Sequence, residues 1–366
     1  MTLKDVAKVL TKLSTGTNLT SKETEEAFDV CIAKDKEAYF FHALTMGLMA
    51  KGITSDELFG FCKSRQKLLP KIKVNFDSSK ITDNSGTGGD KLKTFNVSTV
   101  AAFIIAAADI AVAKQSYFAV TGFGGSGDLF REFGIDVVKE SNPKSIKETI
   151  EKIGFVPYIG EFLPSPNKIP GFLGWVKKRE KTGGLNYISP YHLAANVLTP
   201  IKMERRLYGC FDSRYLSILA ELFQKLGYKK GLIVHGLGGL DEVSNIGDTE
   251  IVEFTKNKLK KYTVSPEDFG IKKAKYDQIK AISAEKNVID FLRILFNKEK
   301  GPKRDIVLMN ASASLSIMDK VASFKEGVQL SKKIIEKNKA ANKLVDLVKT
   351  IGDIEKLERW KKLAAI

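Results

Sequence analysis

The chain has 366 residues, of which 43% are apolar and 28% charged, and its 59 Lys and Arg against 43 Asp and Glu give a formal net charge of +16. This length supports one large core or two unequal domains, and the composition argues against a disordered chain. The three widely spaced cysteines exclude a disulfide framework and a thiolate zinc site, and the scattered lysines indicate a solvated face, with nucleic acid or a phosphorylated substrate as alternatives.

The first 70 residues have a helical pattern. Residues 20–23 and 54–57 each form an S/T-x-x-E capping box, which satisfies the free N–H groups at a helix start. Apolar residues follow at helical spacing, so we expect a small all-helical domain over residues 1–75. The chain opens without a signal-like apolar run, and the Ala-rich stretch 97–113 is too short to span a membrane. These features predict a cytoplasmic protein.

From about residue 78, short runs of β-branched residues alternate with helical segments. This alternation predicts an α/β fold, with a mainly parallel sheet flanked by helices. Strands are expected at residues 111–113, 135–138, 231–235 and 305–309.

A proline-rich break at residues 163–170 interrupts this alternation. We therefore expect a large α/β domain of residues 76–170 and 201–366, with part of 171–200 returning to the small domain. Residues 323–347 are expected to form a charged amphipathic helix near the end of the chain.

The strongest local signal is a glycine-rich loop that precedes a helix. The residues concerned are Gly86, Thr87, Gly88, Gly89 and Asp90, followed by Thr94, Asn96, Ser98 and Thr99. Glycines allow backbone N–H groups to close around phosphate oxygens, and the N–H groups of a helix start favour an anion. An ordinary turn with a serine N-cap would explain either half alone. Together the two halves predict a phosphate cradle, which is not a Walker loop because the Gly-Lys-Ser/Thr ending is absent.

Two further glycine-rich segments follow. Residues 122–127 match G-x-G-x-x-G, but the acidic residue expected about 20 positions later in a dinucleotide site is missing. A second phosphate loop is the better interpretation. Residues 236–242 follow the expected strand 231–235, at the end where α/β folds place ligands. Asp241 and Glu242 there offer the oxygen ligands that Mg²⁺ prefers, although an acidic helix start is the alternative.

No group of side chains in the sequence indicates covalent hydrolase chemistry. His42 lies on an apolar helical face and is expected to be packed, and His235 ends an expected strand. No Ser/His/Asp or Cys/His arrangement is legible, so no catalytic residue is assigned.

The order and spacing of these loops resemble the anthranilate phosphoribosyltransferase family. The resemblance covers nearly the whole chain and rests on GTGGD at 86–90, NxST at 96–99, Leu-Asp-Glu at 240–242 and Lys-Glu-Gly-Val at 325–328. It implies Mg²⁺-dependent transfer of the phosphoribosyl group of 5-phosphoribosyl 1-diphosphate to anthranilate, with release of pyrophosphate, in tryptophan biosynthesis. It also implies a homodimer formed through the small helical domain.

The resemblance assigns roles residue by residue. The residues it implies for the phosphoribosyl diphosphate are Gly86, Thr87, Gly88, Gly89, Asp90, Thr94, Asn96, Ser98, Thr99, Lys114 and Ser126. Those it implies for Mg²⁺ are Ser98, Asp241 and Glu242. Positive groups and Mg²⁺ suit this reaction because the leaving pyrophosphate is a polyanion.

The sequence departs from the family on the acceptor side. Of the family pattern Lys-His-Gly-Asn-Arg, residues 114–118 keep only the first residue, Lys114. Tyr117 stands for the Asn expected to touch anthranilate and Phe118 for the Arg. Arg179 is the candidate for the Arg that meets the anthranilate carboxylate, so Tyr117 and Arg179 define the expected acceptor pocket. Three interpretations stay open: anthranilate as acceptor, another aromatic or nitrogenous acceptor, and a non-catalytic paralogue that binds nucleic acid through a basic groove.

Overall fold

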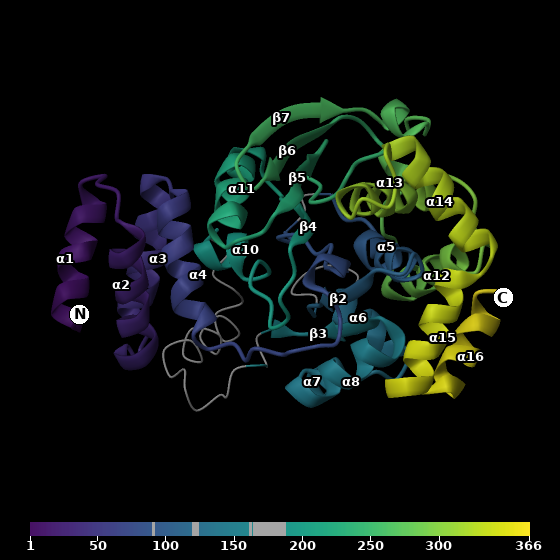
Figure 1. Cartoon of the computed structure of the whole chain (residues 1–366), viewed down its shortest axis with the longest axis horizontal. Helices are drawn as coiled ribbons and strands as arrows, with labels where there is room; N and C mark the ends of the chain where they lie inside the picture. The colour runs from purple at the N-terminus through teal and green to yellow at the C-terminus, as the bar shows by residue number, and fades with distance from the viewer. Residues whose placement is uncertain (90–91, 119–123, 161–162, 164–187) are drawn as a thin grey trace.

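The computed structural model describes residues 1–89, 92–118, 124–160, 163 and 188–366. Four N-terminal helices stand at one end of an elongated molecule, two sheets lie in the middle, and the C-terminal helices cover the other end (Figure 1). Of the helices in these described ranges, none combines the length and the apolarity that a membrane crossing needs.

The N-terminal helices are α1 (Leu3–Ser14), α2 (Ser21–Lys34), α3 (Tyr39–Lys51) and α4 (Ser55–Gln66). The capping boxes expected at Thr20 and Thr54 are both formed. Phe28 holds this layer together, because its ring meets Phe61 and Phe41 edge to face at centroid distances of 4.9 and 5.6 Å.

Two sheets form the centre of the α/β part. The first is parallel, in the order β1 (Ile81–Thr82), β2 (Ala111–Gln115), β3 (Phe155–Tyr158). The second runs β4 (Arg205–Gly209), β5 (Lys230–Gly236), β6 (Thr249–Thr255), β7 (Leu259–Val264), with β4 and β5 parallel and the last two pairings antiparallel.

The two sheets meet at β1 and β4. Thr82 Oγ1 donates a hydrogen bond of 3.1 Å to the Arg205 carbonyl, and Thr87 N–H donates to the Gly209 carbonyl at 2.9 Å. The loops that leave β1 and β4 therefore lie side by side, which is what brings distant segments of the chain into one site.

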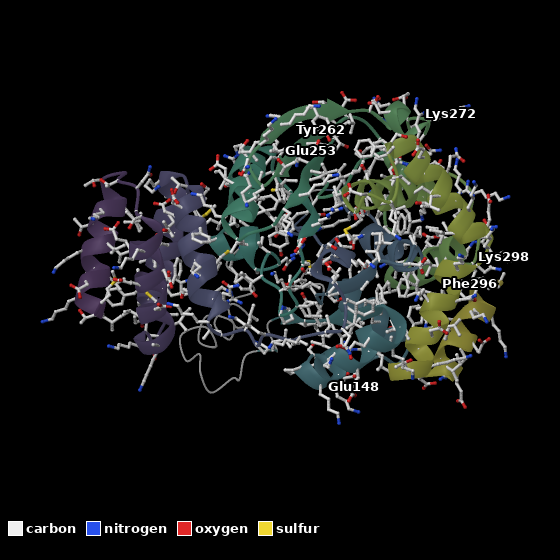
Figure 2. The ribbon with its side chains drawn as sticks, viewed as in Figure 1. Glu148, Glu253, Tyr262, Lys272, Phe296 and Lys298 are labelled. Atoms are coloured by element: carbon white, nitrogen blue, oxygen red, sulfur yellow. The ribbon has the colours of Figure 1, made fainter. Side chains whose placement is uncertain are left out.

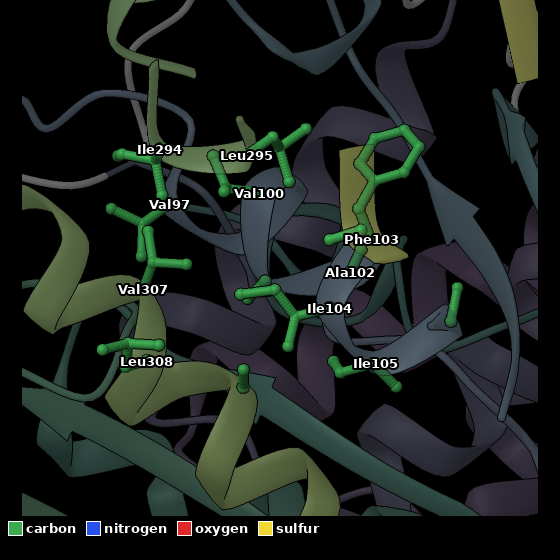
Figure 3. Packing of buried hydrophobic residues seen from close by; sticks show 14 of the residues in the cluster. Val97, Val100, Ala102, Phe103, Ile104, Ile105, Ile294, Leu295, Val307 and Leu308 are labelled. Carbon is green, nitrogen blue, oxygen red and sulfur yellow. The ribbon is translucent and has the colours of Figure 1, made fainter. Parts of the chain in front are cut away.

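Helices surround these sheets. They are α5 (Val97–Ala106), α6 (Ser126–Glu132), α7 (Val137–Glu140), α8 (Pro143–Ile153), α10 (Pro190–Ala194), α11 (Leu216–Lys225), α12 (Ala284–Leu295), α13 (Pro302–Ile317), α14 (Phe324–Glu336), α15 (Lys339–Ile351) and α16 (Ile354–Leu363). Short 3-10 turns occur at Ser78–Lys80, Ser213–Tyr215, Pro266–Phe269 and Tyr276–Gln278. Helix α5 is the centre of the main core, where Val97 and Val100 lie beside residues of α12 and α13 (Figure 3). Because α5 lies at the centre of a close-packed core, the position of its first residues is fixed.

The α/β fold class is confirmed, and so are the strands expected at 111–113 and 231–235. The strands expected at 135–138 and 305–309 are wrong. Residues 137–140 form α7, and residues 305–309 lie inside α13, where Ile306, Val307 and Leu308 are fully buried. A short apolar run that is buried on all sides does not distinguish a strand from a buried helix.

The C-terminal tail also differs from its prediction. The single helix expected over 323–347 is two helices, α14 and α15, separated at Asn338, which has a φ of 55°. Residues 164–170 of the proline-rich break, and residues 171–187 after it, lie outside the described residues, while 188–200 contain α10.

Many charged side chains of both signs lie on the surface of the molecule. Figure 2 labels Glu148, Lys272 and Lys298 on separate parts of its outline. In the antiparallel pair β6 and β7, Tyr262 Oη donates to Glu253 at 3.3 Å (Figure 2). The basic excess is therefore mixed with acidic side chains over the surface.

Candidate active site

The glycine loop after β1 is built against the loops after β4 and β5. Phe211 N–H donates to Thr87 Oγ1 at 3.1 Å, and Asn196 Nδ2 donates to the Gly86 carbonyl at 2.5 Å. A Cβ at Gly86 would overlap Asp241 Oδ2 and lie 2.9 Å from the Gly209 carbonyl oxygen. Glycine at position 86 is therefore a requirement of close approach.

The next two glycines turn the chain toward the acidic pair. Gly88 and Gly89 have φ angles of 66° and 83°, which L side chains rarely adopt. In this conformation Gly88 N–H donates to Asp241 Oδ2 at 2.7 Å. A hydrogen bond thus joins the loop expected to hold phosphate to one of the two carboxylates expected to hold metal, although the two segments lie far apart in the sequence.

The start of α5 provides a second set of polar groups. Asn96 is the N-cap residue, and its Nδ2 is buried without a hydrogen-bond partner among the described residues. The Ser98 carbonyl accepts from Asn84 Nδ2 at 2.8 Å, and Thr99 is only 1% exposed. The buried amide of Asn96 is a donor that a ligand oxygen would satisfy.

Lys114 joins the glycine loop to α5. It lies in β2, it is 2% exposed, and its Nζ donates to Ser85 Oγ at 3.2 Å and to Ser98 Oγ at 3.3 Å. Burial lowers the pKa of this ammonium, while nearby carboxylates, Asp83 first among them, act in the opposite direction. A buried cation at this point favours an anionic ligand.

Ser85 links Lys114 to a buried ion pair between Asp83 and Arg206, which no sequence pattern predicted. Arg206 Nη2 and Asp83 Oδ2 are 2.5 Å apart, and both side chains are fully buried. Asp83 Oδ1 also accepts from the N–H and the Oγ of Ser85, at 3.0 and 2.6 Å. No local pattern links two residues this far apart in the chain, so only the fold could identify the pair.

The acidic pair is positioned to hold a cation. Glu242 is 7% exposed, accepts from Thr94 Oγ1 at 3.4 Å, and lies close to the backbone N–H of Ser98. Burial, followed by the charge of Asp241, raises the pKa of Glu242 to about 8. A bound cation would relieve this repulsion, because two adjacent carboxylates in a dry site repel one another.

The polar groups near the acidic pair would suit Mg²⁺ rather than a closed metal cage. Across the described ranges, no group of three or more His, Cys, Asp or Glu side chains could hold a metal ion. Asp241, Glu242 and the Ser98 hydroxyl together leave coordination positions for substrate phosphates and water, which is how Mg²⁺ is usually bound.

The second glycine-rich segment is described from Gly124 onward. Ser126 begins α6, and its Oγ accepts from Tyr117 N–H at 3.2 Å. Tyr117 Oη accepts from Gln115 Nε2 at 2.6 Å, while the Phe118 ring lies 4.4 Å from the Arg131 guanidinium. Tyr117 therefore faces the end of β2, whereas Phe118 packs against α6.

Tyr117 also lines a small cavity between the N-terminal helices and the α/β part. The other lining residues are Arg65, Leu69, Gln115, Gly160, Tyr191, Ala195 and Leu198. Arg65 is 6% exposed, and its guanidinium lies 5.0 Å from the centroid of the Tyr191 ring. The sequence carried no signal for Arg65, because an arginine near a helix end is ordinarily solvated.

The structure thus brings most of the expected site residues to one place. Those gathered around the meeting point of β1, β4 and β5 are Gly86, Thr87, Gly88, Gly89, Thr94, Asn96, Ser98, Lys114, Asp241 and Glu242. Ser126 and Tyr117 bond to one another beyond the end of β2, next to Gln115. Asp90 and Arg179 lie outside the described residues.

Known proteins are similar to this chain over most of its length. The model of the glycosyl transferase family, a/b domain, matches residues 78–341. Anthranilate phosphoribosyltransferase from Methanococcoides burtonii is 34% identical over 339 residues, which covers 93% of this chain and 92% of that protein.

Solved structures of similar proteins share the fold. The crystal structure of anthranilate phosphoribosyltransferase from Thermus thermophilus matches with a TM-score of 0.82 and 28% identity, covering 93% of this chain and 98% of that one. The Saccharomyces cerevisiae enzyme in complex with PRPP and Mg matches with a TM-score of 0.81 and 20% identity, covering 94% and 97%. At that identity the yeast structure supports the fold alone.

Proposed function

The chain belongs to the anthranilate phosphoribosyltransferase family and is therefore a pentosyltransferase, and we propose that it transfers the phosphoribosyl group of 5-phosphoribosyl 1-diphosphate to anthranilate. In this reaction the bond from ribose C1 to the pyrophosphate oxygen breaks, the acceptor nitrogen bonds to C1, and the amine loses a proton. The observation that carries the proposal is the convergence of the glycine loop, the start of α5, Lys114 and the acidic pair.

The donor half of the site follows from this convergence. Positive charge on Lys114 and the buried Asn96 amide face the region where the diphosphate would lie, and both favour the charge that develops as pyrophosphate leaves. Ribose C1 becomes electron-poor in this step, so fixed positioning contributes more than a strong base. We therefore assign no general base in this chain.

Mg²⁺ would be held by Ser98, Asp241 and Glu242. When bound, Mg²⁺ neutralises pyrophosphate oxygens and makes them a better leaving group. The hydrogen bond from Gly88 N–H to Asp241 keeps that carboxylate directed at the glycine loop, where the diphosphate would be. Replacing both carboxylates removes this cation site without touching Lys114.

The cavity that Tyr117 lines marks the proposed acceptor side. Its free volume of about 10 Å³ has room for about one water, so the lining side chains must move to admit an aromatic ring. The cavity has aromatic walls in Tyr117 and Tyr191, and Arg65 brings a cation that suits a carboxylate. These features fit an aromatic amine that carries a carboxylate, which is the chemistry of anthranilate. Arg179 stays a candidate for the same role. Because Tyr117 replaces the asparagine of the family pattern, a different aromatic acceptor is the second candidate.

The helical N-terminus is the proposed dimer surface, and we propose that residues 1–75 with α10 form the small domain. Helix α10 packs on α3 and α4. The outer face of α3 exposes Tyr39 and Met46, at 70% and 47%, in line with the exposed alanines 43 and 50. An apolar stripe at helical spacing is suited to a second copy of the chain.

The experiment that tests the proposed function follows the loss of anthranilate fluorescence in the presence of phosphoribosyl diphosphate and Mg²⁺. Turnover that requires both is the expected result. Absence of turnover would refute anthranilate as the acceptor, and donor binding measured by calorimetry would then favour another acceptor. Salt-sensitive binding of oligonucleotides in place of donor binding would support the nucleic-acid interpretation instead.

A further inference from the structure

We propose that two buried asparagines, Asn287 in α12 and Asn310 in α13, are positioning residues that set the donor loop and the metal loop separately. This inference rests on the proposed function of those loops. Neither asparagine belongs to a glycine-rich or acidic motif, and neither is expected to touch substrate. Each one uses its side-chain amide to fix the backbone of a segment that is.

Asn287 holds the start of α5. It is 5% exposed, and its Oδ1 accepts from the Asn96 backbone N–H at 3.0 Å. Its Nδ2 lies 4.0 Å from the position that a Cβ on Gly124 would occupy. One side chain therefore lies between the NxST segment and the second glycine-rich segment, which the sequence places almost 30 residues apart.

The chain that leads into α12 supports the same contact. Ala281 N–H donates to the Lys93 carbonyl at 2.9 Å, and Thr94 forms an antiparallel bridge with Lys280. This short pairing runs along the segment between the glycine loop and α5. Residues 92–96 are thus held from the outside by the segment that ends in Asn287, and the direction of the Asn96 amide depends on that hold.

Asn310 holds the loop that carries Asp241 and Glu242. It is 2% exposed, and its Oδ1 accepts from Val243 N–H at 2.9 Å while its Nδ2 donates to the Val243 carbonyl at 2.8 Å. Both backbone polar groups of the residue next to Glu242 are thereby fixed by one side chain. The Asn310 Nδ2 also donates to the Ile306 carbonyl at 2.9 Å, which keeps the amide in register on its own helix.

The two asparagines stand on one rigid support. Asp290 of α12 is 3% exposed, forms an ion pair with Lys303 of α13, and lies 3.0 Å from Lys286. Lys303 Nζ is in turn 5.9 Å from the centroid of the Phe95 ring, next to Asn96. Helices α12 and α13 therefore act together as a frame behind the site, and each contributes one asparagine to one loop.

This arrangement predicts two separable effects. Removing the Asn287 amide leaves the Asn96 N–H without its acceptor and weakens binding of the donor. The loop that carries Asp241 and Glu242 keeps both of its hydrogen bonds to Asn310. Removing the Asn310 amide frees Val243 and weakens the cation site, while the start of α5 stays fixed. If the two asparagines only stabilised the fold, each replacement would lower stability but would not affect donor binding and Mg²⁺ binding separately.

The test uses the full chain and two variants, Asn287→Ala and Asn310→Ala. We would measure the Kd for phosphoribosyl diphosphate at saturating Mg²⁺, and the half-saturating Mg²⁺ concentration at saturating donor. Asn287→Ala is expected to raise the donor Kd about tenfold and to leave the half-saturating Mg²⁺ concentration nearly unchanged. Asn310→Ala is expected to raise the half-saturating Mg²⁺ concentration about tenfold and to leave the donor Kd nearly unchanged. Ser331→Ala, which removes a buried hydroxyl that donates to the Gly327 carbonyl within α14 and to neither loop, is the matched control.

The outcomes are distinct. If the wild-type chain does not bind the donor, the proposed function fails first. If it binds, and both folded variants change the two constants equally or leave them at the wild-type values, the positioning roles are wrong. Should an alanine variant fail to fold, Asn287→Ser and Asn310→Asp take its place, with the same crossed pattern at smaller size, and loss of that pattern overturns the inference.

Discussion

Replacing Gly86 by alanine should displace the Asp241 carboxylate while leaving the fold in place. Gly86 does not have a positive φ, so alanine suits its backbone conformation. The added methyl carbon would overlap Asp241 Oδ2 and lie 3.0 Å from Asp241 Cγ. Side-chain rotation of Asp241 is the easiest relief, and it would break the 2.7 Å bond from Gly88 N–H.

The size of the effect follows from this overlap. Restoring ordinary contact requires a shift of about 1 Å, and a misplacement of that size in a site of this kind costs about 10²-fold in rate. We therefore expect kcat/KM for phosphoribosyl diphosphate to fall about 100-fold in Gly86→Ala. The assay is the loss of anthranilate fluorescence at varied donor concentration, with thermal unfolding measured in parallel.

A double-mutant cycle isolates the cause. In an Asp241→Ala background the carboxylate that clashes with the new methyl group is gone and only the 2.9 Å contact with the Gly209 carbonyl oxygen remains, so Gly86→Ala should add a much smaller loss than it causes in the wild-type chain. Gly47→Ala is the control, because its Cβ would meet only the flexible Leu13 side chain, at 3.1 Å, far from the site. Full additivity of the two changes, or wild-type activity in Gly86→Ala, would refute the reasoning.

Four further results are expected. The double variant Asp241→Ala, Glu242→Ala should lose Mg²⁺-dependent donor binding in calorimetry and keep it if the pair only caps a helix. Arg206→Met should lower the free energy of unfolding in urea by about 3 kcal/mol, because the buried Asp83 carboxylate loses its partner; a loss near zero would contradict this. Tyr117→Asn should change the KM for the acceptor and spare donor binding, and an unchanged acceptor KM would exclude Tyr117 from the pocket. The cysteine thiols should stay unreactive toward iodoacetamide at pH 8 until the chain unfolds, because burial raises the pKa of each to about 12; rapid labelling of the folded protein would contradict the burial of Cys31, Cys62 and Cys210.

Local sequence determined much of this protein. The capping boxes at Thr20 and Thr54, the strands at 111–113 and 231–235 and the α/β class are all present in the structure. The motifs at 86–90, 96–99 and 240–242 were enough to identify the family. Caps, turns and periodicity are encoded over a few residues, which is why they can be recognised in a chain of unknown structure.

Buried helices were harder to predict from the sequence. Residues 306–309 are as apolar as a central strand, yet they form part of α13, where all four are fully buried. A helical period in the sequence arises because polar residues on the solvent-exposed face alternate with apolar residues on the buried face. A helical segment that is buried on every face shows no such period. The roles expected for the site residues stay predictions, including those for Asp90 and Arg179.

Only the tertiary structure decided what supports the site. The Asp83–Arg206 pair, the hold of Asn287 on Asn96, and the place of Arg65 in the cavity each join residues from distant parts of the chain. An arginine or asparagine in isolation resembles an ordinary surface residue, and it becomes a buried partner only when the fold removes water from it. The sequence by itself therefore determined which loops are expected to meet the donor. Packing between remote segments decided how those loops are held.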